Sequence, residues 1–116
     1  MNFDDVRRIA FTFPAVEEHQ VFGAPTLRVG KGFLACIAKI DPDTLVLKIL
    51  DQHERDYWLT THPDIFYLTE HYQNFQCLLI RLSRVAQTDL HNLIEQSWRS
   101  LAPKRVIATW SPPPNA

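Results

Sequence analysis

Five basic residues between positions 28 and 81 are the strongest candidates for a binding site: Arg28, Lys31, Lys39, Lys48 and Arg81. Around three of them, charged and apolar residues alternate with the period of a β-strand, so these basic side chains share the face opposite the predicted core. Lysine and arginine neutralise phosphates, and such a face suits a nucleic-acid backbone or an acidic protein. Three interpretations stay open: a solvated surface, a nucleic-acid site, and a protein or self-association surface.

The apolar residues expected between these cations are Val46, Cys77 and Leu79. None of them is aromatic, so the predicted face lacks the rings on which single-stranded bases stack, and this counts against single-strand binding. Contacts to phosphates position a protein on DNA but do not read its sequence. We therefore expect backbone binding without sequence specificity.

A second region is rich in aromatic residues and surrounds a predicted cleft between a helix at 52–61 and a turn at 71–75. Its members are Tyr57, Trp58, Phe66, Tyr67, Tyr72 and Phe75. Such clusters more often form a satellite core than a ligand pocket. The alternative is a recognition surface for a peptide or a base.

Three histidines, His53, His62 and His71, lie within nineteen residues, but their spacing does not suit a metal site. Ligands on a helix must converge at spacings of three or four residues, whereas these histidines are nine apart. We predict no metal and no cofactor.

Catalytic patterns are also missing from the sequence. The carboxylates at Asp4-Asp5 and Glu17-Glu18 are adjacent, and adjacent residues on a helix do not face the same way. The Gly30-Lys31-Gly32 segment has the chemistry of a hairpin turn and lacks the phosphate-loop pattern. We predict that the protein is not an enzyme.

The composition is that of a globular protein: 116 residues, 46% hydrophobic, 22% charged, with a formal net charge of −1. We expect a single domain at 1–110 and a disordered, proline-rich tail at 111–116. Cys36 and Cys77 lie in apolar runs and are interpreted as packing residues. The sequence shows no targeting segment and no stretch of membrane-spanning length, so the cytoplasm is the expected compartment and no membrane partner is expected.

The predicted elements give an α+β protein with helices on one face of an antiparallel sheet, in the order α-β-β-β-α-β-β-α. They are a helix at 2–13 capped by Asn2, strands around 26–29, 33–40 and 45–49, a helix at 52–61 capped by Asp51 with Glu54, strands at 65–68 and 76–82, and a helix at 88–101 capped by Thr88. Residues 17–20 are interpreted as a polar connection, and 103–110 as a short extra helical turn.

Several motifs, in this order and spacing, resemble the MmcQ/YjbR-like family of small bacterial proteins. They are Phe13-Pro14-x-Val16-Glu17-Glu18, Phe22-Gly23-Ala24-Pro25, Leu27 to Ala35, Leu47-Lys48 and Leu93-Ile94-x-x-Ser97-Trp98. The resemblance covers roughly residues 2–105. Tyr72-Gln73-Asn74-Phe75 departs from it, because many relatives place a Gly and a Trp there.

This resemblance implies a two-layer fold like those of CyaY and frataxin, and a DNA-binding function that rests partly on similarity of fold. It implies no catalytic residues. Frataxin-like folds bind iron through an acidic ridge on the first helix, but here that helix offers Asp4 and Asp5 beside Arg7 and Arg8.

Overall fold

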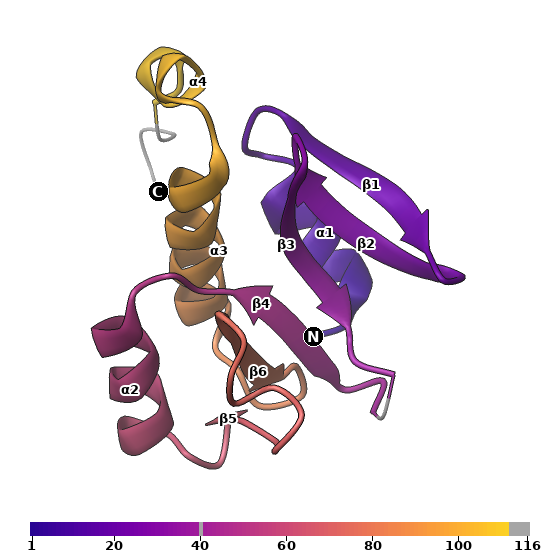
Figure 1. Ribbon diagram of the computed structural model, residues 1–116, viewed down its shortest axis with the longest axis vertical. Coiled ribbons are helices and arrows are strands. Elements are labelled where there is room, and N and C mark those ends of the chain that lie inside the picture. Colours follow the sequence, from indigo (N-terminus) through magenta and orange to yellow (C-terminus); the bar gives the residue numbers. More distant parts are fainter. Residues whose placement is uncertain (40, 112–116) are drawn as a thin grey trace.

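A six-stranded antiparallel sheet with helices packed on one side forms the protein (Figure 1). The computed structural model describes residues 1–39 and 41–111. The elements in chain order are α1 (Phe3–Ala10), β1 (Val16–Val21), β2 (Ala24–Val29), β3 (Gly32–Ile37), β4 (Thr44–Lys48), α2 (Gln52–Thr61), β5 (Phe66–Tyr67), β6 (Cys77–Arg81), α3 (Gln87–Leu101) and α4 (Lys104–Thr109). The strands lie in the order β1-β2-β3-β4-β6-β5, which confirms the predicted α+β class.

The first strand, β1, corrects the predicted element order. It pairs along its whole length with β2, from Val16 opposite Val29 to Val21 opposite Ala24, so residues 17–20 are not a loop. They are polar because β1 is an edge strand with one face in water. Its inward carboxylate, Glu18, accepts two hydrogen bonds from Arg7 at 2.7 and 3.0 Å. The likeness to CyaY and frataxin stays a prediction.

The helix ends differ in detail from the prediction. Asn2 caps α1 as expected, and its side chain and that of Asp5 exchange hydrogen bonds with each other's backbone. The α1 helix ends at Ala10 rather than at residue 13. Asp51 caps α2, but Glu54 accepts from Trp58 and does not bond back to the cap. Likewise α3 begins at Gln87, so Thr88 is not its cap.

Two further predicted boundaries concern residues that the structure leaves out. The predicted strand end at Ile40 lies outside the described residues, and β3 ends at Ile37. The predicted tail at 111–116 also lies outside them, apart from Ser111. The expected extra turn at 103–110 is a separate helix, α4, over Lys104–Thr109.

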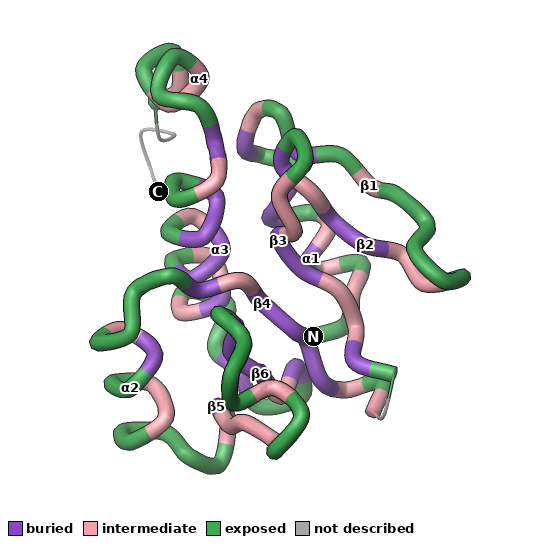
Figure 2. Tube along the Cα trace, in the orientation of Figure 1, coloured by how far each residue is buried: buried purple, intermediate pink, exposed green. Residues whose placement is uncertain are grey.

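The main core lies between the sheet and the helices (Figure 2). Leu45, Leu47, Leu78 and Ile80 face this side and are fully buried. Apolar residues of all four helices join them, since one face of a sheet must be covered by another layer. At the centre, Trp98 of α3 is fully buried and its indole nitrogen donates to the carbonyl of residue 14 at 2.8 Å.

A smaller apolar cluster occupies the opposite side of the sheet. It consists of Ala38, Val46, Cys77 and Leu79. No described helix contributes to this cluster, and we call this side the helix-free face. The loop at 68–76 covers part of it through Tyr72. None of the described helices combines the length and the apolar character needed to cross a membrane.

Candidate functional site

The helix-free face carries the predicted basic residues. Arg28, Lys48 and Arg81 each lie between two residues of the main core along their strands, so their side chains leave the opposite side of the sheet. Lys31 lies in the turn between β2 and β3, and Lys39 follows β3. The structure therefore brings the five residues to one face and its margins.

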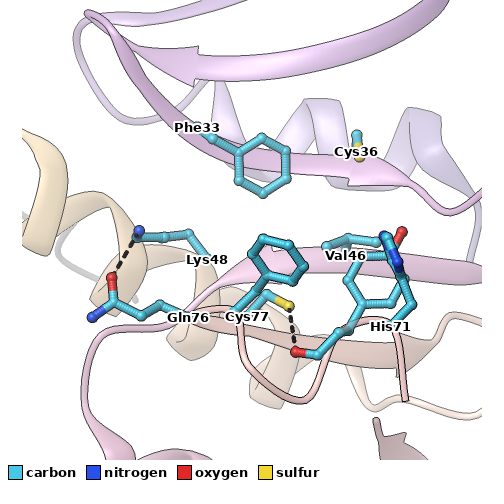
Figure 3. A pocket seen from close by; sticks show the side chains of 9 residues that line it. Phe33, Cys36, Val46, Lys48, His71, Gln76 and Cys77 are labelled. Atoms are coloured by element: carbon cyan, nitrogen blue, oxygen red, sulfur yellow. Dashed lines mark hydrogen bonds between the residues drawn. The ribbon is translucent and has the colours of Figure 1, made fainter. Parts of the chain in front are cut away.

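Two of these cations are held by neutral oxygen atoms. A guanidinium nitrogen of Arg28 donates to the carbonyl of Lys31 at 2.9 Å. The ammonium of Lys48 donates to the side-chain oxygen of Gln76 at 3.2 Å (Figure 3). Both interactions orient the side chain without neutralising its charge.

Two others lie over aromatic rings. The guanidinium carbon of Arg81 is 4.2 Å from the centre of the Tyr67 ring. The ammonium of Lys39 is 5.2 Å from the centre of the Phe22 ring. Such cation–π contacts also leave the positive charge available to an anion.

The nearby carboxylates interact with other groups. Glu17 lies opposite Arg28 in the β1–β2 register, but its carboxylate lies 3.7 Å from Nε2 of His19, a contact that is an ion pair only with a protonated imidazole. Asp43 accepts from the backbone and the hydroxyl of Ser83 at 2.8 and 2.6 Å. Asp41 accepts from the backbone of residue 43 and from Thr44. Within the described chain, no carboxylate lies within the 4.0 Å ion-pair limit of the five cations.

A groove crosses the helix-free face between Lys39 and Lys48. A cavity of about 300 Å³ extends beside Lys48, and a second of about 290 Å³ extends beside Lys39. The two cavities share the walls Phe33, Cys36, His71 and Tyr72. Figure 3 shows Phe33 and Cys36 of β3 above Val46 and Lys48 of β4. His71, Gln76 and Cys77 of the 71–77 segment lie on the same lower side as β4.

Aromatic rings line this groove, so the prediction that the face lacks them is wrong. A bulge between Leu27 and Arg28 shifts the β2–β3 register and sets Phe33 opposite Arg28, on the helix-free face. Tyr72 and Phe75 come from the loop at 68–76. Phe75 is 56% exposed.

The predicted aromatic cleft is not one site, because its members separate onto two sides of the sheet. Trp58 packs on Phe66 in the main core, with ring centres 4.7 Å apart. Tyr67 and Tyr72 pack on the opposite cluster. The first pair therefore belongs to the main core and not to a satellite cluster, whereas Tyr72 belongs to the groove.

Arg55 of α2 anchors the loop that forms one wall of the groove. It is only 9% exposed, and its two terminal nitrogens donate to the carbonyls of Phe75 at 2.6 Å, Gln73 at 3.2 Å and Cys77 at 3.4 Å. Its Nε has no hydrogen-bond partner in the described part of the chain. A planar guanidinium is suited to gathering several carbonyls in this way.

The base of the groove is uncharged at neutral pH. Burial raises the pKa of the Cys36 and Cys77 thiols above their ordinary value of 9.0. Burial likewise raises the pKa of Tyr72. A reactive cysteine needs a lowered pKa, so these thiols act as apolar lining. The groove therefore combines a neutral base with positive margins.

Two of the three histidines singled out in the sequence, His62 and His71, take part in ring contacts. His62 lies beside Trp58 and Phe66, and His71 lies beside Tyr72 with ring centres 4.7 Å apart. Residues 1–39 and 41–111 contain no group of three or more His, Cys, Asp or Glu side chains placed to hold a metal ion.

Three contributors to the groove were missed in the sequence, namely Phe22, Phe33 and Arg55. Phe22-Gly23 does carry a signal, since a bulky residue before Gly is unusual in a tight hairpin. Phe33 and Arg55 carry none, because a strand bulge and contacts across eighteen or more residues place them.

The chain is similar to proteins of unknown activity. The YjbR family model matches residues 11–100. Uncharacterised proteins of Mycobacterium bovis and Mycobacterium tuberculosis are each 26% identical over 122 residues, covering 90% of this chain and 92% of theirs. A crystal structure of a Deinococcus radiodurans protein with a DUF419 domain shares the fold, with a TM-score of 0.71 and 21% identity, covering 84% of this chain and 75% of that one. The family match over most of the chain establishes that this protein belongs to the YjbR family.

Proposed function

We propose that this protein is a non-enzymatic nucleic-acid-binding module of the cytoplasm that uses its helix-free face. Arg28, Lys31, Lys39, Lys48 and Arg81 contact phosphates and position the backbone without reading base sequence. The observation that carries this proposal is the absence of any described carboxylate within 4.0 Å of these five cations. The unpaired thiols of Cys36 and Cys77 suit a reducing compartment.

The contrast with four other arginines supports this proposal. Arg7, Arg8, Arg84 and Arg99 each lie within 4.0 Å of a carboxylate. A protein with a net charge of −1 has enough carboxylates to pair every exposed cation. Four cations of the helix-free face nevertheless contact a carbonyl, an amide oxygen or an aromatic ring, which leaves a field that attracts anions.

The direct test is fluorescence anisotropy of labelled duplex and single-stranded DNA at low and then physiological salt. Phosphate binding releases counterions, so affinity falls steeply as salt rises. Engagement of all five cations predicts slopes of log K against log salt of about −4.5 for duplex and about −3.5 for single strands.

A matched pair of double variants locates the site. Lys48→Glu with Arg81→Glu reverses two charges on the helix-free face, and we expect it to abolish binding. Lys104→Glu with Arg105→Glu makes the same charge change on exposed positions of α4 and serves as the control. Equal loss in both pairs, or no binding by the unaltered protein even at low salt, would remove the proposal.

The rival function is docking of a protein, including a second copy, on the same face. It is favoured by Phe22 and Phe75, which are 91% and 56% exposed. An apolar interface is little affected by salt, so the salt titration separates the two functions.

A further inference from the structure

We infer that the groove on the helix-free face binds the bases of a single-stranded nucleic acid. This inference rests on the proposed function and specifies that the nucleic acid is single-stranded. Four Phe and Tyr rings line the groove: Phe22, Phe33, Tyr72 and Phe75. Proteins bind single strands without sequence preference by combining aromatic rings that stack on bases with cations that contact phosphates.

The position of Phe22 is the first argument. Phe22 is 91% exposed at the tip of the β1–β2 hairpin, so it adds little to the core. Its backbone has a φ of 53°, in the left-handed region that a bulky residue adopts only at an energetic cost. Asparagine or glycine avoids that cost in such turns. A ring held there at the end of the groove is explained by a ligand that stacks on it.

The order of rings and charges is the second argument. Lys39 lies beside Phe22 at one end, and Lys48 lines the other cavity with Phe33 and Phe75. A phosphate backbone that follows the two lysines brings its bases over the rings between them. From β2 to β6 the sheet advances three strand spacings, about 14 Å, which leaves room for a short stretch of single strand.

The apolar walls of the groove argue for single strands over duplex DNA. In a duplex the base faces are stacked on one another, and only their edges are accessible in the grooves. Val46 offers neither a donor nor an acceptor to phosphate or to base edges, and the neutral thiol of Cys36 offers only a weak donor and a weak acceptor. They suit the faces of unstacked bases.

Charge also disfavours a second copy of the chain as the occupant. Face-to-face docking would bring five cations of one copy toward five of the other with no described carboxylate among their ion-pair partners. Like charges brought together in an interface weaken association. An anionic, flexible polymer has the complementary charge.

The test compares an eight-nucleotide thymidine oligomer with an abasic oligomer of the same length, which keeps the phosphates and lacks the bases. At low salt we expect the thymidine oligomer to bind roughly 5- to 150-fold more tightly for each stacked base. Phe22→Ser and Phe75→Ser should each remove one such factor and leave affinity for the abasic oligomer unchanged. Both positions are exposed, so we expect both variants to fold.

Phe11→Ser is the control, since Phe11 is 49% exposed at the end of α1 and lines neither cavity. Unchanged affinity in that variant supports the inference. Equal, salt-dependent binding of the two oligomers would overturn the base-stacking inference while the proposed function stands. No binding of either oligomer would overturn both. Self-association that Phe22→Ser abolishes, without oligonucleotide binding, would assign the face to a second copy.

Discussion

The two faces of the sheet differ in how completely their apolar side chains are buried and in how their charged side chains are paired. On the helix-covered face, Leu45, Leu78 and Trp98 are fully buried. On the helix-free face, the apolar cluster around Val46 and Leu79 is closed by a loop and borders an open groove. The side chains of the helix-covered face are buried by contacts within the chain, whereas part of the helix-free face remains open to solvent.

Charge follows the same division. Arg7 of α1 is held by Glu18 and Asp4, and Arg99 of α3 by Glu95. By contrast, Lys48 and Arg81 of the helix-free face contact an amide and an aromatic ring. Paired charges add to stability, while charges left without a counter-ion remain available for a ligand. One face stabilises the protein, and the other is suited to binding.

The largest effect on stability is expected at the centre of the helix-covered face. Trp98→Ala removes a fully buried side chain and should lower the free energy of unfolding by about 4 kcal/mol. Urea unfolding followed by circular dichroism measures this change. Tyr57→Ala, at an exposed position of α2, should cost less than about 0.5 kcal/mol. Similar losses in both variants would contradict the assignment of Trp98 to the core.

Arg55 links the two faces, so its replacement should affect both properties. Arg55→Met removes charge-assisted bonds to three carbonyls and should cost about 2 kcal/mol. It should also weaken oligonucleotide binding, because the loop with Tyr72 and Phe75 is no longer fixed. Arg84→Met, which removes an exposed contact of 3.9 Å to Asp64, is the control and should cost less than about 0.5 kcal/mol. Unchanged stability and binding in Arg55→Met would mean that other contacts hold the loop.

A pair of matched single variants sharpens the comparison of charges. Arg7→Met should lower the free energy of unfolding by about 1 kcal/mol and leave DNA binding unchanged, since its partner Glu18 is on the helix-covered side. Lys48→Met should change stability by less than about 0.5 kcal/mol and reduce the salt slope of binding by about one. Urea unfolding and salt-dependent anisotropy measure the two properties. The opposite pattern would invert the roles assigned to the faces.

The smallest effect concerns the neutral base of the groove. Because burial raises the pKa of the Cys36 thiol, its thiolate forms at higher pH than in free cysteine. Alkylation by iodoacetamide should be slow at neutral pH and should still be rising above pH 9.0, as mass spectrometry would show. The urea-unfolded protein supplies the reference rate. Equally fast labelling of the folded protein at neutral pH would show a charged, reactive groove.

Much of the fold was predictable because its signals are local. The cap at Asn2 and the helix at 52–61 depend on neighbouring residues, and so does the alternation in β4 and β6 that assigned Lys48 and Arg81 to one side. The edge strand β1 was missed because its exposed face makes it as polar as a loop.

The sequence alone determined the α+β class, the family resemblance and the separation of cations from the core, since each follows from side-chain periodicity and order along the chain. Tertiary structure decided which carboxylates reach which cations, and it built the groove. A bulge places Phe33 on the helix-free face. Arg55 donates hydrogen bonds to carbonyls of a loop that lies eighteen or more residues further along the chain. Contacts between distant segments depend on how the chain packs, and no local pattern specifies them.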